Sequence, residues 1–171
     1  MKIFFCTKRS ALLLVIVSFG VLFSSCKKSS SSNDSGYFVQ ANANGTLVKH
    51  TGYTAAISTT LPGTYVLDIQ GQESLSSSTD ILAAVITDES PITTKTYTDE
   101  TVNGAPQGTV NYYDHTGKQY SSVLATTPAV TITITAITST YVTGTFSGTA
   151  VDINSGETVT LTNGSFKVKK Q

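Results

Sequence analysis

The sharpest pattern of apolar and polar residues lies in the C-terminal third of the chain. From Val130 to Thr135 the two kinds alternate strictly, as in a half-buried strand whose successive side chains point to opposite faces. Beyond a turn at 138–140, a second strand carries apolar or small residues on one face, and a turn at 152–156 leads into a third strand. The inward positions of these two strands are Val142, Gly144, Phe146, Gly148, Ala150, Val159 and Leu161. The pattern predicts a three-stranded meander over 129–169.

The third strand of this meander changes phase. Its inward residues take odd positions at Val159 and Leu161 but even positions at Phe166 and Val168. Because side chains alternate along a strand, such a change needs one extra residue, which is a β-bulge. We predict this bulge at Asn163-Gly164, with the glycine supplying a positive φ angle.

Shorter β patterns fill the chain upstream of the meander. Asn44-Gly45 is a typical hairpin turn pair, and Thr, Val, Ile and Tyr dominate the segments around it. The run from Ile81 to Ile86 is continuously apolar, which fits a central strand or a short buried helix; the turn signals that bound it favour the strand. The predicted strands are 37–42, 46–49, 54–58, 64–70, 81–87, 93–98, 109–113 and 120–124.

Together these segments predict one all-β domain over 37–171. About ten short strands without helical periodicity are typical of a single antiparallel β-sandwich, with a β-barrel as the alternative. A domain of this length buries a sizeable core without disulfides or metal ions.

The first 25 residues have the three parts of a bacterial export signal. Lys2, Lys8 and Arg9 supply positive charge, an apolar run follows from Ala11 to Phe23, and two serines precede a cysteine. The apolar run has 13 residues and is interrupted by a serine and a glycine, whereas a membrane-spanning helix needs about 20 apolar residues. We therefore expect residues 1–25 to be a cleaved signal peptide rather than a transmembrane anchor.

The segment Leu22-Phe23-Ser24-Ser25-Cys26 resembles the lipobox of bacterial lipoproteins. The resemblance implies that the Cys26 thiol receives a diacylglycerol, that the preceding peptide is removed and that Cys26 becomes the N-terminus. Two or three acyl chains hold a protein stably at a bilayer, so the lipid bilayer is the first expected partner. Residues 26–36 are rich in serine and are expected to form a flexible polar linker. Lys27 at the position after the cysteine resembles the signal for sorting to the outer membrane, in its periplasmic or its surface leaflet.

Both ends of the predicted domain carry a second resemblance. The sequences G-T-F-S-G-T-A at 144–150 and L-T-N-G-S-F-K-V at 161–168 are similar to a family of Bacteroidota lipoproteins of unknown function. Its members pair a lipobox with a G-T-F-S-x-x-A strand and a closing T-N-G-x-F strand. The segment 41–45 resembles the first hairpin of that family, although Leu47 and Val48 stand where an aromatic residue usually follows. The resemblance does not extend over 72–125, and it implies structural glycines and core aromatics rather than catalytic residues.

Removal of the signal peptide changes the charge of the chain. It leaves eight basic residues against eleven acidic ones, and the mature part has no arginine. Nucleic-acid surfaces need clustered Lys and Arg to neutralise phosphates, so we expect no nucleic-acid partner. Cys6 and Cys26 both lie at or before the processing site, so we expect no disulfide in the domain.

Candidate catalytic and metal-binding residues are few. His50 and His115 are the two histidines, and His115 follows Asp114. A hydrolase triad needs a nucleophile on a strained turn, and the chain has no G-x-S-x-G motif; we expect 114–118 to be a polar hairpin loop. The segment 152–157 resembles the start of a calcium loop but lacks the later glutamate, which favours a turn. We therefore expect no catalytic activity, no metal ion and no cofactor.

Two surfaces remain as candidates for binding. Tyrosine is enriched at interfaces, and Tyr97, Tyr112, Tyr113 and Tyr120 cluster in the middle of the chain. The second candidate is the outward face of the meander, where threonines alternate with the inward residues. Paired in order, the three strands would form a flat, uncharged array suited to a polysaccharide or a neighbouring envelope protein. Its members are Thr131, Thr133, Thr135, Thr143, Thr145, Thr149, Thr158, Thr160 and Thr162.

The sequence therefore predicts a lipid-anchored protein of the cell envelope whose non-enzymatic β domain binds or scaffolds a partner. A β-barrel carrier of a small apolar ligand is the first alternative, and a hydrolase is the second. The size of the interior side chains distinguishes a carrier from a closed sandwich. A carrier keeps a cavity of about several hundred Å³, whereas a closed sandwich fills its core with large side chains.

Overall fold

The computed structural model describes residues 36–73, 80–102 and 104–171. The predicted signal peptide, Cys26 and the linker up to Ser35 lie outside the described residues. Within the described ranges, no helix is long and apolar enough to cross a membrane.

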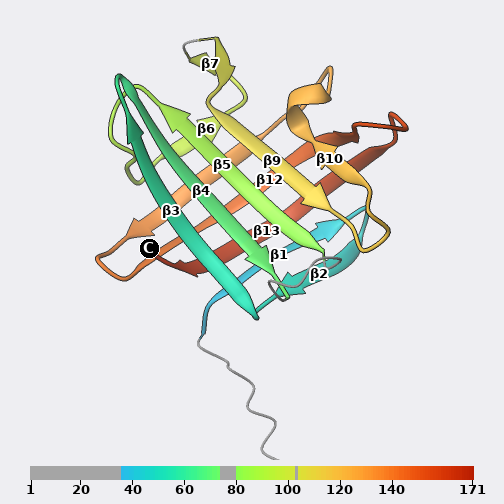
Figure 1. Ribbon diagram of the computed structural model, residues 1–171, viewed down its shortest axis with the longest axis horizontal. Coiled ribbons are helices and arrows are strands. Elements are labelled where there is room, and N and C mark those ends of the chain that lie inside the picture. Colours follow the sequence, from blue (N-terminus) through green and yellow to red (C-terminus); the bar gives the residue numbers. More distant parts are fainter. Residues whose placement is uncertain (1–35, 74–79, 103) are drawn as a thin grey trace, which may run out of the picture. The chain divides into compact units, whose positions relative to one another are not determined.

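The described chain folds into β-structure, as the sequence predicts (Figure 1). One short 3-10 helix, Ser122–Leu124, follows β10. The strands are β1 (Phe38–Ala43), β2 (Thr46–His50), β3 (Tyr53–Leu61), β4 (Thr64–Gln72), β5 (Ile81–Asp88), β6 (Thr96–Thr98), β7 (Thr101–Val102), β8 (Ala105–Pro106), β9 (Gly108–Tyr113), β10 (Gln119–Ser121), β11 (Thr131–Ile137), β12 (Tyr141–Asp152) and β13 (Thr158–Lys169).

Most of these strands belong to one eleven-stranded antiparallel sheet. Its main path runs β2-β1-β13-β12-β10-β9-β5-β4-β3. The long strand β12 pairs with β13 along one side, while on its other side the first half pairs with β11 and the end pairs with β10. Strand β6 extends the sheet beyond β11, and β7 pairs with β8 in a separate hairpin.

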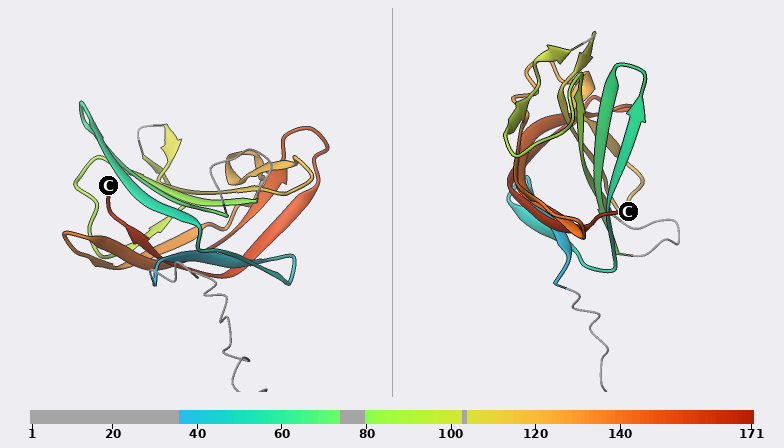
Figure 2. Two further views of the ribbon diagram at one scale, coloured as in Figure 1. Left: turned by 60° about the horizontal axis from the view of Figure 1, so that its bottom comes forward. Right: turned by 90° about the vertical axis from the view of Figure 1, so that its left-hand side faces the viewer.

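The sheet bends back until its last strand meets the end of the chain. Ala56 of β3 forms an isolated bridge with Lys170, and the Gln171 N–H donates to the Ala56 carbonyl oxygen at 3.0 Å. Figure 2 shows β3 and β4 facing the curved wall that contains β12 and β13. The all-β, antiparallel class is confirmed, and because the sheet nearly closes into a barrel, both the sandwich and the barrel describe it.

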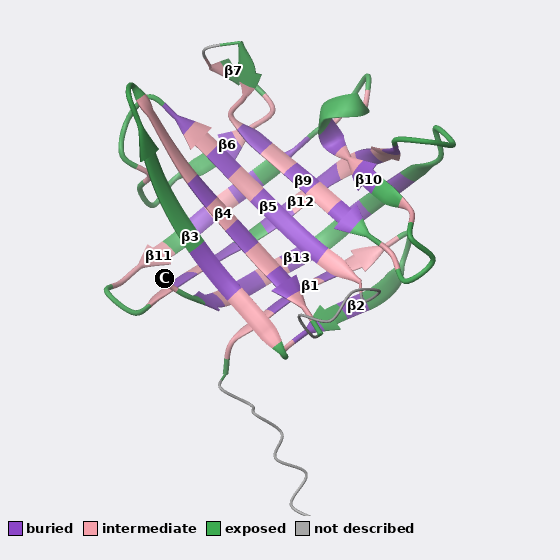
Figure 3. Ribbon diagram, viewed as in Figure 1, coloured by how far each residue is buried: buried purple, intermediate pink, exposed green. Residues whose placement is uncertain are grey.

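Buried positions lie along the strands of both walls (Figure 3). Large apolar side chains at these positions form the core. The inward positions predicted for the meander are buried, among them Ile132, Phe146 and Phe166. The facing wall contributes Leu67, Ile69, Leu82, Ile86 and Val110, each at most 2% exposed. Burial of this apolar area supplies the main driving force for folding.

Two glycine–phenylalanine pairs stabilise the hairpin of β12 and β13. Gly144 lies opposite Phe166, and Gly164 lies opposite Phe146. A Cβ atom on Gly144 would lie 2.6 Å from the Phe166 ring, and one on Gly164 would lie 2.8 Å from the Phe146 ring. Each ring therefore occupies the space that a side chain on the facing glycine would need, and the ring centroids lie 6.4 Å apart.

The predicted bulge in β13 is present, but a different residue supplies its positive φ angle. Phe146 pairs with Gly164 and Gly148 with Leu161, so three steps along β13 face two along β12. Asn163 has a φ of 52°, a region that asparagine tolerates better than most residues. The prediction that Gly164 supplies this angle is wrong; Gly164 is required because a Cβ there would lie 2.3 Å from the Phe146 carbonyl oxygen.

The limits of other strands depart from the sequence pattern for identifiable reasons. The apolar run from Ile81 is the central strand β5, paired with β4 and β9, rather than a helix. The predicted strand 93–98 shrinks to β6, because the Tyr97 hydroxyl bonds both the N–H and the carbonyl oxygen of Thr93. The predicted strand 120–124 ends at Ser121, where Ser122 turns inward and its Oγ accepts a hydrogen bond from the Val110 N–H at 3.0 Å.

Candidate functional site

A cleft of about 630 Å³ lies where the β1–β2 hairpin approaches β9, β10 and the loops beside them. Its size falls within the usual range of small-molecule sites, about 300–1,000 Å³. The lining residues are Ala43, Asn44, Thr46, Leu47, Val48, Lys49, His50, Glu73, Asp80, Tyr112, Asp114, His115, Tyr120 and Val159.

The β1–β2 hairpin forms one wall of the cleft, and its position follows from its turn. Asn44 and Gly45 have φ angles of 47° and 87°, which are required of a two-residue hairpin turn whose twist matches the strands. The Asn44 N–H donates to the Thr160 carbonyl oxygen, and the Asn44 Oδ1 accepts from the Thr160 N–H at 2.9 Å. These two hydrogen bonds fix the hairpin against β13.

His50 is buried at the end of β2. Alternation along β2 turns Val48 and His50 inward, and His50 is only 4% exposed. The β4 backbone comes close at Gly71, where a Cβ atom would lie 3.3 Å from the His50 Cβ. Neither ring nitrogen has a hydrogen-bond partner among the described residues, although the Glu73 Oε2 lies 3.9 Å from Nδ1. Burial lowers the pKa of His50, against the opposing effects of Asp80 and Glu73, so the imidazole is neutral at pH 7.

Asp80, the residue immediately before β5, lines the same cleft. Its Oδ1 atom lies 3.5 Å from the Nδ1 atom of His115, but it is buried and makes no hydrogen bond with the part of the chain that the structure describes. A buried oxygen without a donor is costly, about 1–3 kcal/mol. Asp80 and His50 therefore both line one cleft and both carry buried polar atoms without a hydrogen-bond partner among the described residues.

Two tyrosines of the predicted cluster form the wall opposite the hairpin. The rings of Tyr112 and Tyr120 stack with centroids 5.8 Å apart and an angle of 18° between their planes. Burial, with smaller effects of Asp80 and Asp114, raises the pKa of Tyr112 to about 12. Its phenol therefore stays protonated at neutral pH and remains a hydrogen-bond donor.

The other two tyrosines lie elsewhere, so the structure splits the predicted tyrosine cluster. Tyr97 is fully buried in the core, where its hydroxyl bonds Thr93. It therefore cannot belong to a binding surface. Tyr113 alternates with Tyr112 along β9 and is 38% exposed on the outer face.

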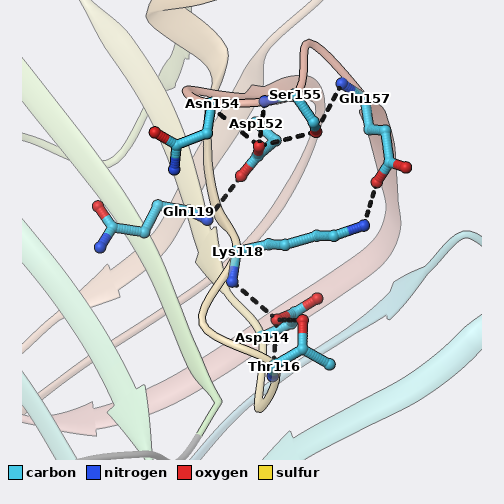
Figure 4. Close-up of polar contacts among 8 residues, drawn as sticks. All are labelled: Asp114, Thr116, Lys118, Gln119, Asp152, Asn154, Ser155 and Glu157. Atoms are coloured by element: carbon cyan, nitrogen blue, oxygen red, sulfur yellow. Dashed lines mark hydrogen bonds and ion pairs between the residues drawn. The ribbon is translucent and has the colours of Figure 1, made fainter.

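The two polar segments that the sequence assigned to turns are turns (Figure 4). The Asp114 Oδ1 accepts hydrogen bonds from the Thr116 and Lys118 N–H groups and from the Thr116 hydroxyl. The Asp152 carboxylate accepts from the N–H groups of its own turn and, through Oδ2, from the Gln119 N–H at 2.9 Å. These hydrogen bonds, first of all those with Ser155, lower the pKa of Asp152 to about 2.

The outward threonines of the meander lie side by side, and β6 extends their rows. Thr133 pairs with Thr145 on one side and with Thr96 on the other. The hydroxyl oxygens of Thr96 and Thr133 are 2.9 Å apart, as are those of Thr135 and Thr143. The other predicted members of the array also lie at paired positions of β11, β12 and β13. They are Thr131, Thr149, Thr158, Thr160 and Thr162.

The array is neither uncharged nor flat, which corrects the sequence prediction. The bulge in β13 shifts the phase of the strand and brings Ser165 and Lys167 to the outward side, where Lys167 lies opposite Thr143. The Lys167 ammonium group lies 5.2 Å from the centroid of the Tyr141 ring. Figure 2 shows that the wall carrying β12 and β13 is curved.

The sequence pattern marked His50 only as one of the few candidate catalytic or metal-binding residues and did not indicate the cleft. The one available signal was alternation from Val48, which places His50 at an inward position one residue beyond the predicted strand 46–49. Within the described ranges, no three His, Cys, Asp or Glu side chains are arranged to hold a metal ion. Comparisons with protein-family models, curated proteins and solved structures found no match to this chain.

Proposed function

We propose that the protein is a cell-envelope lipoprotein, anchored through acylated Cys26, whose β domain is a non-enzymatic binding module. The cleft between the β1–β2 hairpin and the Tyr112–Tyr120 pair is its ligand site. The observation that carries this proposal is His50, which lines a cleft of about 630 Å³ and whose two buried ring nitrogens have no hydrogen-bond partner among the described residues. Buried polar groups are almost always hydrogen-bonded, so a ligand that supplies the missing partners is the simplest account.

A polar ligand is favoured over the apolar cargo of a carrier. The space between the two walls is filled by large side chains such as Phe146, Phe166 and Leu82. The cleft instead carries His50, Asp80 and other polar residues in its lining. Polar groups of this kind fix the orientation of a small molecule and provide specificity.

The direct test is recovery of the ligand. The full chain, expressed in its native envelope and purified in detergent, is extracted, and the released small molecules are identified by mass spectrometry. Leu47→Trp places a bulky ring at the cleft, because Leu47 lines it and is 61% exposed. Leu61→Trp is the matched control, since Leu61 is 53% exposed on a strand outside the cleft lining.

The expected result is a compound that accompanies the unmodified protein and Leu61→Trp but is lost from Leu47→Trp. Equal recovery from both variants would place the ligand outside the cleft. Recovery of no compound from the unmodified protein would contradict the proposal, because the purification retains the anchor and the natural environment of the site.

A further inference from the structure

The formal charges that line the cleft are unbalanced. Glu73, Asp80 and Asp114 contribute three carboxylates, and the described lining contains one lysine, Lys49. His115 also lines the cleft, and its Nδ1 atom lies 3.5 Å from the Asp80 Oδ1. The Lys49 ammonium group lies 5.8 Å from the centroid of the Phe38 ring, and Phe38 is not part of the lining. An anionic ligand would therefore meet net repulsion in the cleft, whereas a cation would be attracted.

Two buried hydrogen-bond acceptors point to the same kind of ligand. Asp80 Oδ1 has no donor among the described residues, and neither has the unprotonated ring nitrogen of His50. The Asp80 and Glu73 charges favour protonation of His50, but burial outweighs them. The cleft thus attracts a positive charge that His50 does not supply.

The tyrosine wall adds a surface that suits a cation. Tyr112 and Tyr120 stack with nearly parallel rings, and both line the cleft. The face of an aromatic ring attracts an ammonium group, by about 0.5–1 kcal/mol at exposed sites and about 2 kcal/mol when water is excluded.

We propose that the cleft binds the ammonium group of an organic amine, with Asp80 as counter-ion, His50 as hydrogen-bond acceptor and the Tyr112–Tyr120 pair as an aromatic wall. This inference rests on the proposed function and adds the chemical class of the ligand. An ammonium group has three N–H donors and no acceptor, so it has donors for both buried acceptors and no acceptor left unsatisfied. The organic part of the amine then packs against the tyrosine rings and Val159.

The test uses three probes that differ in charge: 1,4-diaminobutane, 1,4-butanediol and succinate. Binding to the full chain in detergent is measured by titration calorimetry at neutral pH and low salt, and the ring nitrogens of His50 are followed by NMR. We expect the diamine to bind and to shift the His50 resonances, with no binding of succinate and at least tenfold weaker binding of the diol. Higher salt should weaken the diamine complex, because ions screen charge–charge attraction.

Single variants test which carboxylate contributes to diamine binding. Asp80→Asn should weaken diamine binding at least tenfold, whereas Glu89→Gln, an exposed carboxylate outside the cleft lining, should leave it unchanged. Glu73→Gln provides a second test on a 62% exposed side chain in case Asp80→Asn does not fold, and we expect it to weaken binding severalfold.

Three outcomes would overturn the inference: no binding of the diamine, equal binding of the diol, or unchanged diamine affinity in the folded Asp80→Asn and Glu73→Gln variants. If the diol or succinate bound instead and Leu47→Trp abolished that binding, the cleft would still be a ligand site. The inferred ligand class would then fail while the proposed function stood.

Discussion

Two kinds of single residue matter most in this protein: glycines that make room for neighbouring rings, and a buried histidine whose ring nitrogens lack hydrogen-bond partners among the described residues. Gly144 and Gly164 leave room for the phenylalanine rings of the neighbouring strand. His50 leaves two buried nitrogens without partners among the described residues. The first kind of residue governs stability, and the second governs the proposed binding.

The role of Gly164 leads to a stability prediction. Gly164→Val should lower the free energy of unfolding by about 1–3 kcal/mol, because its side chain must displace the Phe146 ring or backbone from a filled core. Urea unfolding of the two proteins measures the difference. Asn163→Gly is the matched control at the neighbouring position, where a positive φ angle suits glycine, and it should change stability little. Equal curves for the unmodified protein and Gly164→Val would show that Phe146 does not need this space.

His50 leads to a prediction on pH. Its pKa is lowered in the folded state, so below about pH 6.5 the unfolded chain binds a proton that the folded protein does not. Stability should therefore be level above this pH and should fall progressively as the pH drops from there towards the folded pKa. Asp80 and Glu73 oppose the shift and limit its size. His50→Gln should lose this dependence, whereas mutation of the exposed His115 to Gln should keep it. Parallel stability profiles of His50→Gln and the unmodified protein between pH 7 and pH 5 would contradict the burial argument.

At the scale of elements, most of the local structure could be predicted from the sequence, but little of the candidate site could. The alternation over 130–135, the Asn44-Gly45 turn and the phase change in β13 each predicted an element that the structure has. These features arise from neighbours in the chain or from adjacent strands. The cleft joins Leu47, Asp80 and Tyr112, which are far apart in the sequence, and no periodicity shows that they meet. Strands β7 and β8 have two residues each, too few to produce an alternating pattern.

The array of outward threonines on the meander leads to a prediction at the same scale. If it docks a polysaccharide or an envelope protein, Thr133→Lys combined with Thr145→Lys should abolish crosslinking of that partner in intact envelopes. The two residues are paired across β11 and β12, so the two like charges should destabilise the sheet by only about 0.2–1 kcal/mol and Tm should fall by a few degrees. A double variant that crosslinks to the same partners would identify the face as ordinary solvent-exposed sheet.

At the scale of the whole molecule, the proposed function needs both the anchor predicted at Cys26 and the cleft of the β domain. Lipidation at Cys26 predicts that metabolic labelling with a fatty-acid analogue marks the unmodified protein. Cys26→Ser should remain an unprocessed and unlabelled precursor, because the thiol is the acceptor of the lipid. Cys6→Ser, which changes the other cysteine of the chain, should be labelled and processed normally. Labelling of Cys26→Ser would disprove the anchor.

A ligand in the cleft that satisfies His50 and Asp80 would be visible in an experimental structure. The most direct measurement is a crystal structure of the protein purified from its own envelope at high resolution. We expect ordered non-protein density in the cleft, with donor atoms within about 3.2 Å of the Asp80 Oδ1 and of one His50 ring nitrogen. A cleft that contains only ordered water, or one in which residues of the same chain bond both groups, would contradict this expectation.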